Sequence, residues 1–392
     1  MAPILRRLLS KVHPGNLGNS TYLIAEATIA LSKFGSTEER HSAITKAEEL
    51  PSLPHHLAVA IATRKSTILR MLGQHDESLE VIASTMRQEC FPYCDENLKL
   101  HKKFDKTLSQ NNRHYAECEL LLLSQMECDL QRGDYGDITT HLARWSCTDM
   151  KEISWLEAFT YRSQVNFAAR MYRWKGEFAR AHEKLTEILG KTTLLDTNRP
   201  QMLAQHAGVL CELDREQEAV HLLRNDLQAW ERNRANTKGL RRLQVSLLEA
   251  LTKLGLHDEG DEVSHSLSEF YDQYRGGDSV DDLLIVRTSL CQALRAHLRS
   301  VGNETPLGAW KTVESLWLLA KRNIEHSNVF EFPGYTDSVV DLWLMDARRR
   351  GPAQEHVYQA NLLEVEPREY CIAGFGTYWL EKAKTLLDLD SV

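Results

Sequence analysis

The stretch Val165-Asn-Phe-Ala-Ala-Arg-Met-Tyr-Arg-Trp-Lys-Gly176-Glu-Phe-Ala-Arg-Ala181 decides the fold. Apolar and small residues recur at helical spacing before Gly176, and the pattern resumes after it at Ala181, Leu185 and Ile188. A glycine that follows a helix accepts the left-handed conformation that ends it. The stretch therefore predicts two antiparallel helices joined by a short turn.

Turns of the same kind recur along the chain, each between two segments with helical periodicity. Their central residues are Gly35, Gly73, Gly133, Gly176, Asp214 and Gly255, separated by 38, 60, 43, 38 and 41 residues. In most of them an acidic residue follows within the first turn of the next helix, where the helix dipole favours it. One hairpin cannot bury both of its apolar faces, so the hairpins are expected to stack.

The quoted stretch resembles a tetratricopeptide repeat. The matching positions are Ala168 and Ala169 at the Leu-Gly of the motif, Tyr172 at its tyrosine, Gly176 at its turn and Ala181 at the small residue of its second helix. The chain departs from the motif in its longer units, near 40 residues rather than about 34, and in Val165, which stands where the motif has tryptophan. The resemblance implies a degenerate array of stacked hairpins over about residues 20–275.

The predicted fold class is therefore all-α, a right-handed superhelix (solenoid) of antiparallel helix hairpins closed by an aromatic-rich C-terminal helical cap. A basic segment at 1–19 precedes the repeats at 20–275, and residues 276–392 form the C-terminal part. Five helices are predicted there, at 281–300, 306–327, 337–350, 353–363 and 376–387. Trp310, Trp317, Trp343 and Trp379 fall in this region. They favour an apolar cap, with an aromatic-lined pocket as the alternative.

Composition narrows the class of protein. Only 20 glycines and 10 prolines in 392 residues argue against an all-β fold, and a net charge of −8 argues against a general nucleic-acid binder. No window approaches 18 apolar residues, so we expect no membrane span. The basic N-terminus lacks a secretory apolar core. We expect a cytoplasmic protein, with the nucleus and, less so, the mitochondrion as alternatives.

The chain carries no nucleotide-binding, hydrolase, metalloprotease or kinase motif. One metal candidate stands out, because Cys90, Cys94, His114 and Cys118 offer three thiolates and an imidazole with spacings that structural zinc sites use. The intervening residues are helix-like and rich in lysine, which favours ordinary thiols. We therefore predict no metal and no cofactor.

The resemblance also implies a binding face. Positions 2, 5, 9 and 12 of a tetratricopeptide first helix face the groove, which here are Ser163, Asn166, Arg170 and Arg173, then Gln201, Ala204, Gly208 and Cys211, with Arg242 in the following unit. The predicted site is Asn166, Arg170, Arg173, Gln201 and Arg242. Amide and guanidinium groups hydrogen-bond peptide backbone and carboxylates well, so the expected partner is an acidic or extended peptide of another protein.

These patterns favour a non-enzymatic interaction scaffold or adaptor. Two alternatives stay open. The array is similar to the C-terminal sensor arrays of fungal and bacterial signalling ATPases, here without the ATPase, which predicts a regulatory sensor. An enzyme or accessory protein with a pocket against the aromatic C-terminal region is the other.

Overall fold

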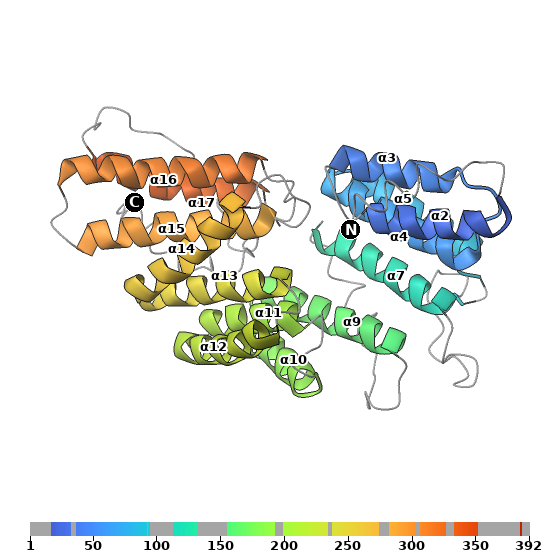
Figure 1. The fold of residues 1–392 in the computed structure, drawn as a ribbon, viewed down its shortest axis with the longest axis horizontal. Helices are drawn as coiled ribbons and strands as arrows, with labels where there is room; N and C mark the ends of the chain where they lie inside the picture. Colours follow the sequence, from blue (N-terminus) through green and yellow to red (C-terminus); the bar gives the residue numbers. More distant parts are fainter. Residues whose placement is uncertain are drawn as a thin grey trace. The chain divides into compact units, whose positions relative to one another are not determined.

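A computed structural model describes residues 17–32, 37–91, 93–94, 113–131, 155–192, 199–233, 237–273, 282–302, 306–326, 333–351 and 385. These residues form fourteen α-helices and no β-strand (Figure 1). The all-helical prediction is confirmed for this part of the chain. None of the helices in these ranges is at once long and apolar enough to cross a bilayer.

The chain divides into two compact units, Met1–Phe167 and Ala168–Val392. The first unit contains α2 (Leu17–Leu31), α3 (Thr37–Glu48), α4 (His55–Met71), α5 (His75–Glu89) and α7 (Arg113–Gln131). Helix α4 packs against each of the other four. Its apolar residues therefore contribute to two core clusters, one shared with α2 and α3 and one shared with α5 and α7.

The boundary between the units falls within α9 (Trp155–Trp174). The second unit continues with α10 (Phe178–Gly190), α11 (Arg199–Glu212), α12 (Glu216–Asn233), α13 (Thr237–Leu254), α14 (His257–Gln273), α15 (Asp282–Gly302), α16 (Leu307–His326) and α17 (Pro333–Arg350). From α10 onward successive helices contact each other, and α13 also contacts α11 and α15 directly. We call α9, α11, α13 and α15 the first helices and α10, α12, α14 and α16 the second helices.

Four of the predicted turns lie in the described residues, and all four have the expected backbone. The φ angle is +73° at Gly73, +72° at Gly176, +56° at Asp214 and +72° at Gly255. In each turn the next amide donates to the carbonyl five residues earlier, at 2.8–3.0 Å. This is the hydrogen bond of the Schellman motif, which ends a helix in a left-handed residue. Gly35 and Gly133 lie outside the described residues.

The C-terminal helices end close to where the sequence predicts. The predicted segments at 281–300, 306–327 and 337–350 correspond to α15, α16 and α17. These three helices share one apolar core that contains Trp310, Trp317 and Trp343. The predicted helices at 353–363 and 376–387 lie almost wholly outside the described residues, as does Trp379.

Candidate functional site

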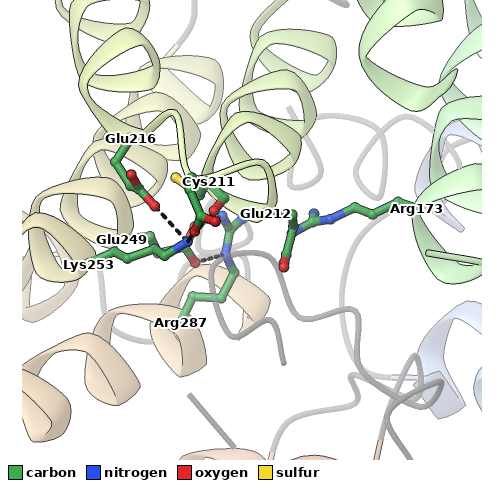
Figure 2. Close-up of polar contacts among 8 residues, drawn as sticks. Arg173, Cys211, Glu212, Glu216, Glu249, Lys253 and Arg287 are labelled. Carbon is green, nitrogen blue, oxygen red and sulfur yellow. Dashed lines mark hydrogen bonds and ion pairs between the residues drawn. The ribbon is translucent and has the colours of Figure 1, made fainter. Parts of the chain in front are cut away.

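The first helices of the second unit are buried around most of their circumference. Along α11, the buried residues run from Met202 to Cys211 with Gln205 as the one exception, and α13 is buried from Val245 to Thr252. Charged side chains on these helices must therefore find partners inside the protein. They form a set of ion pairs that we call the first-helix network (Figure 2). Its members are Arg173, Glu212, Asp214, Glu216, Ser246, Glu249, Lys253 and Arg287.

Arg173 joins the last turn of α9 to the end of α11. Its Nη2 donates to Glu212 Oε1 at 3.1 Å, and the two side chains are 7% and 10% exposed. Gly208 makes room for this pair, because a Cβ at that position would lie 2.8 Å from Arg173 Nη1. The guanidinium is thus enclosed between a helix backbone and a carboxylate.

Lys253 joins α13 to the turn between α11 and α12. Its ammonium contacts Glu216 Oε1 at 2.6 Å and Asp214 Oδ1 at 3.2 Å, and it donates to the Cys211 carbonyl. Figure 2 shows Lys253 reaching toward Glu216. Burial lowers the pKa of Lys253, but the two acidic partners outweigh burial and leave that pKa above its usual value. The lysine therefore stays charged and secures the turn.

Arg287 on α15 and Glu249 on α13 form the most enclosed pair. Arg287 Nε and Nη2 donate to the two carboxylate oxygens of Glu249, each at 2.6 Å, and Nη2 also donates to Ser246 Oγ at 3.2 Å. The Arg287 and Glu249 side chains are 6% and 5% exposed. Burial raises the pKa of Glu249 above its ordinary value, and the bidentate contact with Arg287, which favours the carboxylate, only partly opposes this.

The residues predicted to bind a partner have different environments. Gln201 is exposed, whereas Asn166, Arg170 and Arg242 are half-buried. The Oδ1 atom of Asn166 is shielded and accepts no hydrogen bond from the described residues. Arg173 is buried and paired with Glu212. Arg173 is thus a member of the first-helix network.

The other predicted groove positions of the second unit, Ala204, Gly208 and Cys211, are also buried. The motif-based assignment placed them on a solvent-facing groove, but α11 is enclosed there by neighbouring side chains such as Arg173. Accessible polar surface on α11 thus lies toward its N-terminal end, where Gln201 is.

Sequence reasoning missed the other members of the network, although a signal for them exists. Steps of 38 residues from Arg173 reach Cys211, Glu249 and Arg287, and Glu212 is the neighbour of Cys211. Arg173, Glu249 and Arg287 are thus charged residues spaced by multiples of 38, whereas Cys211 occupies the remaining step. This spacing is the sequence signal for part of the network.

The metal candidate folds as part of an apolar core. Cys90, Cys94 and Cys118 are buried in a cluster with side chains of α4, α5 and α7. His114 Nε2 donates a hydrogen bond to the Glu89 carbonyl oxygen at 2.7 Å. A hydrogen bond with Cys90, followed by burial, raises the pKa of Cys118. Among the residues described, no group of three or more potential ligands has an arrangement that could hold a metal ion.

The C-terminal tryptophans surround a polar chain. Trp317 Nε1 donates to His297 Nδ1 at 3.1 Å, and His297 Nε2 donates to Asp346 Oδ2 at 2.8 Å. Arg350 Nε donates to the same carboxylate oxygen at 2.7 Å. His297 and Asp346 are 0% and 1% exposed, so this chain is sealed inside the core of α15, α16 and α17.

No protein-family model matches the chain, and no curated protein or solved structure matches it either.

Proposed function

We propose that the protein is a non-catalytic interaction scaffold, built as a right-handed superhelix of tetratricopeptide-like hairpins and capped by the aromatic C-terminal helices. The observation that carries this proposal is two enclosed ion pairs of nearly equal sequence separation. Arg173 pairs with Glu212, 39 residues later, and Glu249 pairs with Arg287, 38 residues later, which links α9 to α11 and α13 to α15. Equivalent helices that bond at equivalent positions are expected of a repeat array.

The partner contacts the polar residues predicted on the first helices. In the second unit Gln201 is exposed, and Arg170 and Arg242 are half-buried. An amide can donate to and accept from a peptide backbone, and a guanidinium binds a carboxylate through two parallel hydrogen bonds. A segment of another protein that is extended or acidic fits these groups.

Two matched charge variants test the proposal. Gln201→Glu with Arg242→Glu adds negative charge to α11 and α13, whereas Gln228→Glu with Lys184→Glu makes the same change on the second helices α12 and α10. Each protein is used to capture partners from native extract, with quantitative mass spectrometry as the readout and far-UV circular dichroism as the check of folding. We expect the first variant to lose at least 90% of a partner that the second retains. Equal recovery by both variants would show that the first helices do not bind it.

The enzyme alternative at the aromatic region receives less support from the geometry. His297 and Asp346 converge there as an acid–base pair would, but both are sealed and both are already bonded within the protein. A general base must come within hydrogen-bond distance of a substrate proton. The pair therefore serves to hold α15, α16 and α17 together.

A further inference from the structure

Two histidines in the second unit are bonded directly to each other. His182 Nδ1 on α10 lies 2.8 Å from His206 Nε2 on α11, and the ring centroids are 4.9 Å apart. The Thr186 hydroxyl lies 3.4 Å from the same His206 nitrogen. His206 is 5% exposed, while His182 is half-buried. The contact belongs to neither the first-helix network nor the predicted binding face.

The position of each proton in this contact follows from Arg215. Its Nη1 lies 3.2 Å from His182 Nε2, and a guanidinium can only donate. His182 Nε2 is therefore the acceptor, so the His182 hydrogen sits on Nδ1 and is donated to His206 Nε2. Both imidazoles are then neutral, and His206 carries its own hydrogen on Nδ1, which is buried and has no hydrogen-bond partner among the described residues.

An added proton has no site that preserves these bonds. On His182 Nε2 it would face the Arg215 guanidinium, and on His206 Nε2 it would face the His182 N–H. The charged groups that act on both rings are Arg215 in the turn before α12 and Glu218 on α12. Burial, together with Arg215 and the neighbouring imidazole, lowers the pKa of His206 to about 4, and Glu218 only partly opposes this. Burial and Arg215 also lower the pKa of His182.

We propose that the contact between α10 and α11 is a proton-sensitive junction, closed while His182 and His206 are neutral and opened when they take up protons. The proposal stands on the hydrogen-bond direction set by Arg215 and does not depend on the proposed function. In the open state each imidazole has an ordinary pKa of about 6.5. Between pH 7.5 and pH 5.5 the open population therefore rises about 10-fold through His206, and further through His182.

Hydrogen–deuterium exchange on the full chain measures this opening. The exchange rates of α10 and α11 amides are compared at pH 7.5 and pH 5.5 after correction for the intrinsic pH dependence of exchange. We expect the opening constant of the wild-type junction to rise by more than about 10-fold. A rise of less than threefold would overturn the proposal.

Two variants assign the effect to this pair. His182→Gln keeps an N–H that can donate to His206 but removes one titrating group, so the rise should fall to about 10-fold. His221→Gln changes an exposed histidine on α12 and should keep the full rise. If His182→Gln retained the full rise, the protons would bind elsewhere. The wild-type measurement by itself remains decisive if the variant folds poorly.

Discussion

Removal of Arg287 should expose the cost of burying Glu249. In Arg287→Met, the carboxylate loses both 2.6 Å bonds and stays in a site where its side chain is 5% exposed. An uncompensated buried charge is strongly unfavourable, so Glu249 should take up a proton. Holding a proton at pH 7 on a carboxyl whose ordinary pKa is 4.5 costs about 3 kcal/mol. We expect the free energy of unfolding to fall by at least that amount, within the roughly 3–5 kcal/mol typical of broken buried pairs.

The same reasoning predicts a pH signature. Protonation of Glu249 becomes easier as the pH falls. The loss in the free energy of unfolding caused by Arg287→Met should therefore shrink to about 1 kcal/mol near pH 5. Replacement of both residues in Arg287→Met with Glu249→Met should restore most of the lost stability, because no charge is left buried. Urea unfolding followed by far-UV circular dichroism at pH 7 and pH 5 measures both effects.

Arg224→Met is the matched control for this experiment. Arg224 likewise donates hydrogen bonds to both carboxylate oxygens of one glutamate, Glu259, at 2.5–3.0 Å, but the two side chains are 48% and 36% exposed. Exposed pairs contribute about 0–1 kcal/mol, so this variant should remain within 1 kcal/mol of wild type. If Arg287→Met were equally mild at pH 7, or if its deficit did not change with pH, then Glu249 would not be a buried charge held by Arg287.

Two further predictions concern the second unit. Acid should destabilise this unit, because the pKa of His206 in the folded protein is lowered to about 4. The neutral histidine costs no stability above pH 6.5. As the pH falls from 6.5 to 4, the free energy of unfolding should decrease by about 3 kcal/mol. Urea midpoints measured from pH 7.5 to pH 4 should decrease accordingly, and a constant midpoint would contradict the neutral assignment. Gly208→Ala should destabilise by about 1–3 kcal/mol, since its Cβ would meet the Arg173 guanidinium. Gly190→Ala, on α10 with open space around it, should be neutral or slightly stabilising. Urea unfolding of both variants measures the difference, and equal effects would rule out the Arg173 contact.

The sequence reveals most about features that local interactions control. A left-handed residue ends a helix whatever its neighbours are, so the turns at Gly73, Gly176 and Gly255 are predictable to the residue. The end of α15 at Gly302 lies within two residues of its predicted position. Helical periodicity likewise locates α16 within one residue at each end.

Side-chain partners distant in sequence are harder to predict. Arg173 and Glu212 are 39 residues apart, and His182 and His206 are 24 residues apart. Whether Arg173 faces solvent or Glu212 depends on how closely α9 and α11 approach each other. The close approach is possible because Gly208 has no side chain. Motif positions describe which way a residue points from its own helix. They do not report how much of that direction the next helix fills.

The sign of the charges in the first-helix network bears on how the helices choose their neighbours. A hydrophobic residue at each of these positions would often give equal or greater stability, but it would suit any neighbouring helix. Arg173 on α9 requires an acidic residue on α11, and Glu249 on α13 requires a basic residue on α15. Glu212 and Glu249 repel each other across α11 and α13, which Arg173 and Arg287 offset. If these charges determine which helices pack together, the variant Arg287→Met with Glu249→Met should keep most of its stability. It should nevertheless refold with a larger aggregated fraction than wild type.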